Sequence, residues 1–394
     1  MRTSWLQTGL NARLRGHSSD HPHGGGEDTG AAENGRTENS GITTPLGNTD
    51  NRDTDNREDT ELKVWDLHSD TLSELRYAEN DEQRDNISFL RNNLHIDLER
   101  LKEGDYLLQC LACFVHLGRE EKSPLAACLE MVDRFHRLLL EYPEDLMWVK
   151  SPADIELLPG SGKIGVMLTV EEGGVCLDDV RMLRNLYRLG VRMMTLGWNF
   201  DNGLGSPNLP YGAKSDVWPP QPETEKGLTQ KGLEFVEAMN DMHMIIDVSH
   251  LSDAGFMDVA RTSKMPFAAS HSNARAICPH PRNLTDEMIR TMGEKGCLIG
   301  LNYYGAFLDP TPDRSQVTSR ISDMIIHARH IMDVGGEDIL ALGSDFDGID
   351  GELELKGAQD MPKLAQGMEQ AGFSQELIEK IFYKNAMRFF KENL

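Results

Sequence analysis

A histidine and an aspartate stand two residues apart at the end of a short apolar segment, in the run Val-Trp-Asp-Leu-His-Ser-Asp at positions 64–70. If the segment is a β-strand, His68 and Asp70 point to the same side, because side chains alternate along a strand. Neutral imidazole nitrogen and carboxylate oxygen both bind divalent transition metals. A His and an Asp at this spacing are more often polar residues on the protein surface than metal ligands, so the metal interpretation depends on the rest of the chain.

Polar side chains that suit metal chemistry follow four further apolar segments, namely Glu171 or its neighbour Glu172, His250, His271 and Asp345. Histidines and carboxylates that gather in one cleft are typical of metal sites. One catalytic zinc takes about three protein ligands and a water, whereas five ligands fit two metals that share a carboxylate. The five candidate ligands are His68, Asp70, Glu171, His250 and His271. Two cations can hold a hydroxide between them and polarise a carbonyl, so the pattern indicates metal-assisted hydrolysis.

These residues need elements that bring them to one place. Eight apolar segments have the character of strands: residues 63–67, 106–115, 164–170, 193–199, 244–249, 266–270, 297–302 and 339–344. Stretches with apolar residues at helical spacing lie between them, at 125–141, 178–189, 230–242, 252–262, 286–294 and 317–334, and a last helix is expected over 374–392. Ser252 and Thr285 are expected to cap two of these helices. Strands that alternate with helices predict a parallel sheet with right-handed crossovers.

Eight strands favour a closed (β/α)8 barrel, with an open doubly wound sheet as the alternative fold. In such barrels the functional residues gather at the C-terminal ends of the strands, where the candidate ligands are expected. The longest irregular insert, residues 200–229, is rich in Gly, Pro and Asn and follows the fourth strand. A loop at that place lies over the barrel mouth, where long loops are usually functional. The alternative is a surface loop without a function.

The composition separates the first sixty residues from the rest. Residues 17–60 contain almost no large apolar side chains, so residues 1–60 are expected to be a disordered extension and 61–394 a single hydrolase domain. Four polar residues that lie close together in the extension are not counted as ligands: His17, Asp20, His21 and His23. The formal net charge of −24 argues against nucleic acid, whose phosphates need basic partners.

The chain has no apolar run long enough for a transmembrane helix, and its N-terminus lacks the apolar core of a secretory signal, so no membrane partner is expected. The six cysteines are scattered and mostly lie in apolar runs, which fits reduced thiols in a cytoplasmic protein. Cys110 and Cys113 form a C-x-x-C pair, but no second pair follows and the flanking residues are apolar. Core packing is therefore favoured over zinc or redox chemistry for these thiols.

The chain resembles the membrane dipeptidase family, zinc peptidases of the amidohydrolase superfamily that form peptidase family M19. The match runs from about residue 64 to the C-terminus, and its markers are Asp-Leu-His-Ser-Asp at 66–70, Val-Glu at 170–171, Ile-Asp-Val-Ser-His at 246–250, Ser-His-Ser at 270–272, Arg-Asn at 282–283 and Gly-Ser-Asp-Phe-Asp-Gly at 343–348. The resemblance implies a (β/α)8 barrel with two zinc ions that hydrolyses dipeptides. His68 and Asp70 would hold one zinc, His250 and His271 the other, and a glutamate would bridge them.

Counting back in the family pattern from the Leu-Tyr-x-Leu-Gly-x-Arg segment at 186–192 assigns the bridging role to Glu171, with Glu172 as the alternative. By the same resemblance, Asp345 contacts the free amine of the substrate and manages protons. Arg282 takes the C-terminal carboxylate, a bidentate task that suits a guanidinium. An acid and an arginine at a fixed separation favour the binding of a substrate of dipeptide length.

The chain departs from the family after the fourth strand. Mammalian members carry there a histidine that helps to polarise the scissile carbonyl, whereas this chain has Trp198, whose indole N–H can donate a hydrogen bond but cannot titrate. Tyr304 lies where the family lines the substrate pocket, and Trp198 is expected to contact the substrate as well. The chain also lacks the lipid-anchor tail of the mammalian enzymes, so it resembles a soluble, bacterial-type member. Because dimers are usual in the family, a homodimer is expected.

Two other functions compete with this interpretation. The first is another binuclear amidohydrolase, such as a lactonase or amidase. Those relatives commonly show His-x-His on the first strand and often a carbamylated lysine after the fourth, whereas this chain has His-x-Asp and no lysine in 193–199. The second is a non-catalytic binding protein on the same fold, against which the complete set of five ligands argues.

Overall fold

The computed structural model describes residues 62–80, 87–120, 123–212 and 218–394 of the chain. The part from Leu62 to Leu394 forms one compact unit. The predicted disordered extension over residues 1–60 lies outside the described residues.

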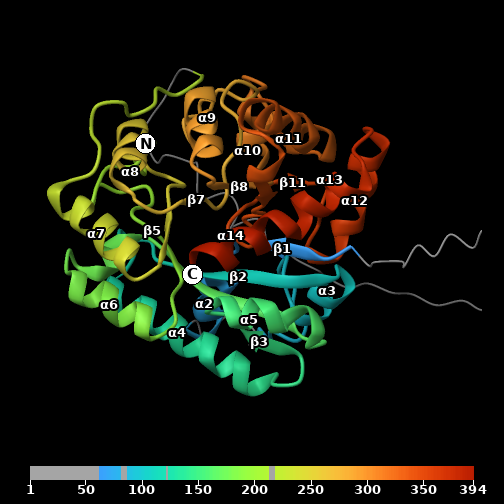
Figure 1. The fold of residues 1–394 in the computed structure, drawn as a ribbon, viewed down its shortest axis with the longest axis horizontal. Helices are drawn as coiled ribbons and strands as arrows, with labels where there is room; N and C mark the ends of the chain where they lie inside the picture. The colour runs from blue at the N-terminus through green and yellow to red at the C-terminus, as the bar shows by residue number, and fades with distance from the viewer. Residues whose placement is uncertain (1–61, 81–86, 121–122, 213–217) are drawn as a thin grey trace, which may run out of the picture. The chain divides into compact units, whose positions relative to one another are not determined.

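Eight parallel strands close into a ring that helices surround (Figure 1). In order around the ring they are β1 (Val64–Asp66), β2 (Tyr106–Phe114), β4 (Ile164–Glu171), β5 (Met193–Thr195), β6 (Ile245–Asp247), β7 (Ala268–Ala269), β8 (Leu298–Leu301) and β10 (Leu340–Leu342). The ring closes because β2 pairs with β4 on one side and with β1 on the other, and β1 pairs in turn with β10. The predicted (β/α)8 barrel is therefore confirmed, and the open doubly wound sheet is wrong.

The observed strands coincide with the predicted segments, although most are shorter. β5 ends at Thr195 rather than at residue 199. Three further strands were not predicted: β3 (Leu146–Trp148), which pairs with β4 outside the ring, and β9 (Thr318–Ser319) and β11 (Glu352–Leu353), which pair with each other. β9 and β11 have two residues each and no apolar run surrounds them, so the sequence gives no strand pattern there.

The helices are α2 (Thr71–Asn80), α3 (Leu98–Glu103), α4 (Pro124–Glu141), α5 (Pro152–Leu157), α6 (Val180–Arg188), α7 (Gln230–Asp241), α8 (Asp253–Thr262), α9 (Asp286–Glu294), α10 (Gly305–Leu308), α11 (Ile321–Gly335), α12 (Met361–Gln370), α13 (Gln375–Glu379) and α14 (Asn385–Asn393). The hydroxyls of Ser252 and Thr285 accept hydrogen bonds from the backbone three residues on, so both predicted caps are confirmed. The predicted last helix is divided by a π-helical turn, Lys380–Lys384, into α13 and α14. Among the shorter helices, α2, α3, α5, α10 and α12 were not predicted.

The C-terminal helix closes one end of the barrel. Met193 and Ile245, each the first residue of its strand, are buried in one cluster with Phe389 and Phe390 of α14. The Trp65 ring of β1 stacks on Phe390, with 5.6 Å between the ring centroids. The end at which the strands begin is thus filled by apolar packing.

The opposite end, where the strands finish, carries the long insert. Within it, the backbone N–H of Asn208 donates to the carbonyl of His250 at 2.8 Å, and the N–H of Tyr211 donates to the carbonyl of Asn199 at 2.5 Å. The insert therefore lies at the mouth of the barrel, as predicted, apart from residues 213–217, which are not described.

Candidate metal centre

The five candidate ligands lie together at the C-terminal end of the barrel. His68 and Asp70 belong to the turn between β1 and α2, and Glu171 is the last residue of β4. His250 and His271 follow β6 and β7. Each of the five is at most 7% exposed, so their polar atoms depend on one another rather than on bulk water.

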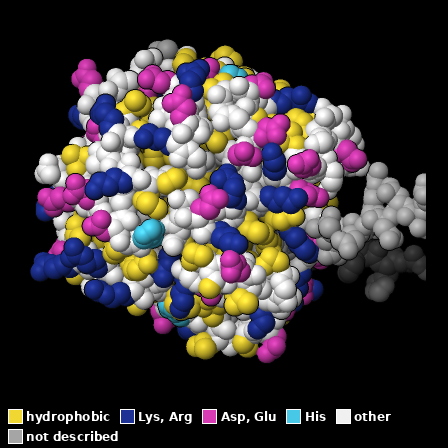
Figure 2. All heavy atoms as spheres, viewed as in Figure 1, with side chains coloured by type: hydrophobic (Ala, Val, Ile, Leu, Met, Phe, Trp, Pro, Cys, Tyr) yellow, Lys and Arg dark blue, Asp and Glu magenta, His cyan; other side chains and the backbone are white. Residues whose placement is uncertain are grey.

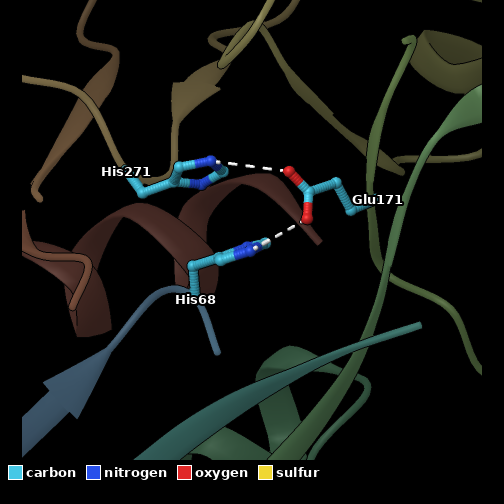
Figure 3. A group of neighbouring side chains, drawn as sticks. All are labelled: His68, Glu171 and His271. Atoms are coloured by element: carbon cyan, nitrogen blue, oxygen red, sulfur yellow. Dashed lines mark ion pairs between the residues drawn. The ribbon is translucent and has the colours of Figure 1, made fainter. Parts of the chain in front are cut away.

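One oxygen of the Glu171 carboxylate faces His68, and the other faces His250 and His271. Figure 3 shows the His68 and His271 rings next to each other on the same side of Glu171, with 4.0 Å between the ring centroids. Oε2 of Glu171 lies 3.3 Å from Nε2 of His68. Its Oε1 lies 2.9 Å from Nε2 of His250 and 3.6 Å from Nε2 of His271. Asp70 lies next to His68, with its Oδ1 3.7 Å from Nε2 of His68. A carboxylate that bridged two cations would need one oxygen toward each group of ligands, as Glu171 has here.

The neighbouring Glu172 turns away from the histidines. Its backbone is left-handed, with φ of 97°. Its carboxylate accepts hydrogen bonds from the backbone N–H groups of Gly174 at 2.7 Å and Trp198 at 2.9 Å. The side-chain amide of Asn202 donates a third at 2.5 Å. Glu172 therefore anchors the loop after β5, and only Glu171 faces the other candidate ligands.

Hydrogen bonds on the far side of each ring fix how His250 and His271 present their nitrogens. Nδ1 of His250 lies 2.9 Å from Oδ1 of Asn199, an atom that only accepts, so this nitrogen carries the proton. Nδ1 of His271 lies 2.8 Å from the Ser270 hydroxyl, which itself donates to Asp247 at 2.5 Å. Nδ1 is therefore the donor in His271 as well. In both rings Nε2 keeps its lone pair free for a metal.

These two lone pairs point at each other, because the Nε2 atoms of His250 and His271 lie 2.9 Å apart. Two acceptors at that distance repel unless a cation lies close to both. Nε2 of His68 and Oδ1 of Asp70 are also buried without a hydrogen-bond partner among the described residues. An unpaired buried polar group costs about 1–3 kcal/mol. Nitrogen and carboxylate donors of this kind suit zinc and related metals, so the residues fit a metal site.

Acidic groups around His68 favour a positive charge at this place. Ligand atoms of His68, Asp70 and Asp345 lie within 4.8 Å of one another, and so do those of His68, Glu171 and His271. Burial alone would lower the pKa of His68, but the carboxylates of Glu171, Asp70 and Asp345 raise it to about 10. Without a metal ion the cluster thus holds a proton, which a bound cation would replace.

His250 and His271 are neutral at pH 7. Burial, with the positive charge of Arg282, lowers the pKa of His250 to about 4. Burial, with the charge of His68, lowers the pKa of His271 well below its usual value. Neutral imidazole is the form that binds metals, so these two rings are already in the required state.

Asp345 adjoins the first ligand pair. Its Oδ1 lies 4.0 Å from Nε2 of His68, and its Oδ2 accepts a hydrogen bond from the Asn302 amide at 2.9 Å. Burial raises the pKa of Asp345 to about 6, although the charge of His68 opposes this. A carboxyl group that titrates near neutrality can accept a proton and release it again.

Arg282 is buried, and no acidic side chain among the described residues forms an ion pair with it. It is 5% exposed, and its Nε has no hydrogen-bond partner among the described residues. One Nη donates to the carbonyl of His271 at a long 3.4 Å. Burial lowers the pKa of Arg282 to about 10, so the guanidinium stays charged at pH 7. A buried guanidinium with open donors beside the ligands is suited to an incoming anion.

The two remaining predicted residues adjoin the ligands from different strands. The Trp198 ring, after β5, lies 6.1 Å from the His250 ring between centroids. Tyr304, after β8, donates from its hydroxyl to Asp350 at 3.4 Å. Burial, together with Asp350, raises the pKa of Tyr304. The structure therefore brings together the ligands, Asp345, Arg282 and Trp198, with Tyr304 at the rim.

Two buried aspartates tie neighbouring strand ends together, a role the sequence did not reveal. Oδ1 of Asp66 accepts from the backbone N–H groups of His68 at 3.2 Å and Ser344 at 2.9 Å, which joins β1 to β10. Oδ1 of Asp247 accepts from the N–H of Ser270 at 2.9 Å, which joins β6 to β7. Each aspartate lies a few residues before a ligand, and that position was the only signal in the sequence.

Three further residues near the site had no predicted role: His116 after β2, Asn199 after β5 and Asn302 after β8. In the sequence, only their position shortly after a predicted strand could have indicated that these residues lie near the site. In the described part of the chain, no helix combines the length and the apolar character needed to cross a bilayer.

Comparison with known proteins gives a consistent picture. A family model described as membrane dipeptidase, peptidase family M19, matches residues 56–393. An uncharacterized dipeptidase of Schizosaccharomyces pombe is 31% identical over 313 residues, which cover 76% of this chain and 72% of that protein. A Klebsiella pneumoniae protein, described only by its position in the pqqA 5' region, is 34% identical over 241 residues, or 61% of this chain and 86% of its own.

Two solved structures share the fold over nearly their whole length. A metallopeptidase of Rhodobacter sphaeroides, bound to a phosphinate mimic of the dipeptide L-Ala-D-Ala, is 26% identical with a TM-score of 0.77, covering 84% of this chain and 99% of its own. A dipeptidase of family M19 is 26% identical with a TM-score of 0.75, covering 84% of this chain and 98% of its own.

Proposed function

This chain belongs to the membrane dipeptidase family, peptidase family M19, and is a peptide-bond hydrolase; from that premise we propose that it is a zinc-dependent dipeptidase whose catalytic unit is residues 61–394. The observation that carries the proposal is the position of Glu171, with one carboxylate oxygen toward His68 and the other toward His250 and His271. A carboxylate shared by two sets of ligands supports a site for two metal ions.

The ligands divide into two pairs around that glutamate: His68 and Asp70 for one ion, His250 and His271 for the other. Nitrogen and carboxylate donors of this kind bind zinc, although similar ligands accept manganese or cobalt. When bound, the ions would lower the pKa of water, so that a nucleophile is available at neutral pH, and would polarise the scissile carbonyl.

Arg282 and Asp345 suit the two ends of a dipeptide. Arg282 has open donors for the C-terminal carboxylate, and Asp345 supplies a carboxylate for the free amine. The two residues follow β7 and β10, so a substrate that reaches both has a restricted length. The related R. sphaeroides enzyme, which binds a mimic of a dipeptide, supports this substrate class.

Asp345 also suits the proton transfers of hydrolysis. The reaction breaks the peptide C–N bond, adds the oxygen of water to the carbonyl carbon and delivers a proton to the leaving nitrogen. With a pKa of about 6, Asp345 can take the proton from the attacking water and pass it to that nitrogen. Trp198 can donate a hydrogen bond to the substrate from its indole N–H, and Tyr304 lines the pocket.

Turnover by metal-free protein, before and after zinc is added, tests this function. The substrates are a set of dipeptides, a tripeptide, a lactone and a phosphotriester. We expect dipeptide hydrolysis only with zinc, and much slower cleavage of the tripeptide. Hydrolysis confined to the lactone or the phosphotriester would assign the chain to another binuclear hydrolase. Failure to bind zinc would favour a binding protein on the same fold.

We also propose a reducing compartment, the cytoplasm, for this protein. All six cysteines are buried and unpaired, although several lie in the same core. Thiols that stay free in a folded protein are usual where disulfides are kept reduced. Detection of the protein by antibody in fractionated cells tests this location, and recovery mainly outside the cytoplasmic fraction would contradict it.

A further inference from the structure

Five ring-bearing side chains gather on one side of the metal centre, and the proposed chemistry does not use them as a group. We call them the aromatic group: Phe114, His116, Trp198, Phe200 and Tyr211. They come from the end of β2, the turn after β5 and the long insert. Phe114, Trp198 and Phe200 are half-buried, and Tyr211 is 38% exposed. Apolar rings therefore reach solvent at the barrel mouth.

His116 lies at the centre of this group. Its ring centroid is 4.6 Å from that of Tyr211, 5.1 Å from that of Phe200 and 5.2 Å from that of Trp198. The Tyr211 and Phe200 rings meet it edge-on, an arrangement that aromatic pairs favour. The group thus forms an apolar enclosure around one imidazole.

Within the described part of the chain, the His116 imidazole has no hydrogen-bond partner. His116 is 3% exposed, and neither Nδ1 nor Nε2 is paired with any of the described residues. Burial, with the positive charge of Arg119, lowers the pKa of His116, so the ring is neutral and offers one donor and one acceptor. Unpaired buried nitrogens are costly, and a ligand that supplied the missing partner would remove that cost.

The aromatic group is continuous with the metal centre. β2 and β5 both pair with β4, so the group flanks the strand that ends in Glu171. Trp198 links the two directly, since its ring adjoins that of His250 at 6.1 Å. The residues proposed for the substrate's ends, Arg282 and Asp345, follow β7 and β10 on another part of the ring. In the ring order, β7 and β10 lie opposite β4 and its neighbours, so a dipeptide held by its ends there can extend a side chain across the barrel mouth toward the aromatic group.

We propose that the aromatic group is a subsite for one side chain of the dipeptide, that it favours an aromatic side chain, and that His116 makes it favour tyrosine over phenylalanine. The proposal rests on the dipeptidase function proposed above. A substrate ring can take the place of the partly exposed Tyr211 ring against His116, with the same edge-on contact. A phenol hydroxyl would then reach an imidazole nitrogen that lacks a partner. Sites built to bond a hydroxyl discriminate against the analogue without it.

Ratios of kcat/KM between substrates test the subsite. The zinc-loaded protein is assayed with Ala-Ala, Phe-Ala, Tyr-Ala, Ala-Phe and Ala-Tyr, so that each position of the dipeptide is examined separately. We expect tyrosine to exceed phenylalanine by about tenfold at one position, the value of one good hydrogen bond. Phenylalanine should exceed alanine at the same position. Ratios measured on one preparation do not depend on its metal loading or folded fraction.

Substitutions of His116 and Phe200 separate the contribution of the hydrogen bond from that of the aromatic contacts. His116→Phe keeps a ring but removes the hydrogen bond, so the tyrosine-to-phenylalanine ratio should fall to about one while phenylalanine stays ahead of alanine. His116→Gln should restore part of the tyrosine preference. Phe200→Ala should lower the phenylalanine-to-alanine ratio several-fold, since one aromatic contact contributes about 0.5–1.5 kcal/mol. Tyr187→Ala is the matched control, because that ring packs on Arg192 at the other end of the barrel and should leave every ratio unchanged.

The outcomes distinguish this inference from the proposed function. Equal ratios in the original protein and in His116→Phe, at both positions, would overturn the role of His116. Cleavage of Ala-Ala without any preference for aromatic dipeptides would overturn the subsite and leave the dipeptidase function intact. Failure to cleave any dipeptide with zinc bound would contradict the proposed function itself.

Discussion

Glu171 connects the two halves of the proposed site. Its oxygens face His68 on one side and His250 with His271 on the other, whereas the carboxylate of Glu172 is occupied by three donors. The choice between the two glutamates could be predicted by counting residues in the family pattern. Its physical reason, a left-handed backbone at Glu172 that turns the side chain away, is visible only in three dimensions.

Exchanging each glutamate for glutamine tests this assignment. Glu171→Gln should lose most of its bound zinc, because an amide is a poor bridging ligand. Glu172→Gln should keep its zinc and instead lose about 1–3 kcal/mol of folding free energy, since an amide cannot accept all three hydrogen bonds. Metal analysis and denaturant unfolding of both variants provide the comparison. Loss of zinc only in Glu172→Gln would reverse the assignment.

Binding of the metal should release a proton from His68. The pKa of His68 in the metal-free protein is raised from about 6.5 to about 10, so the proton stays bound throughout the neutral range and must leave when the metal enters. The apparent zinc affinity should therefore rise about tenfold per pH unit between pH 7 and 9. Calorimetric titration in buffers of different ionisation enthalpy measures the protons released. A pH-independent affinity with no proton release would be inconsistent with the cluster.

Asp345 is expected to act on protons rather than to hold the metal. Asp345→Asn should lower kcat by about 10²–10⁴-fold, the usual contribution of a positioned acid or base, while the zinc content stays the same. Glu352→Gln, a few residues further along and exposed, is the control and should change kcat less than about threefold. If Asp345→Asn loses zinc in proportion to activity, Asp345 is a ligand instead.

At the scale of elements, parallel strands bring the ligands to one end of the barrel. The strands could be predicted because buried parallel strands are nearly continuous apolar runs. The connections between strand ends could not, since Asp66 bonds to Ser344 and Asp247 to Ser270 across long sequence separations. His116 was missed for a similar reason, because its ring neighbours come from other parts of the chain.

The chain of contacts from Asp247 through Ser270 to His271 gives a prediction about these connections. Ser270→Ala removes the hydroxyl that holds the Nδ1 proton of His271, and zinc affinity should fall about 10–100-fold, as when other partners of metal-binding histidines are removed. Ser272→Ala is a close control, because Ser272 follows His271 directly in the sequence and is as buried as Ser270. Its hydroxyl has no hydrogen-bond partner among the described residues. Competition with a zinc chelator measures both. Equal affinities in the two variants would refute the positioning role.

At the scale of the whole molecule, the net charge of −24 predicts that the protein does not bind nucleic acid. On the face drawn in Figure 2, Lys and Arg side chains are interspersed with Asp and Glu, so this face has no basic stripe of the kind that nucleic acid requires. The boundary at residue 61, the homodimer and the zinc ions stay predictions.

The central claim is that two metal ions, joined by Glu171, are needed for dipeptide hydrolysis. Zinc is titrated into metal-free protein, and bound zinc and Ala-Ala hydrolysis are measured on the same samples. We expect activity to reach its plateau only as the bound zinc approaches two ions per chain. Full activity with one ion per chain, or a capacity for no more than one, would contradict the claim.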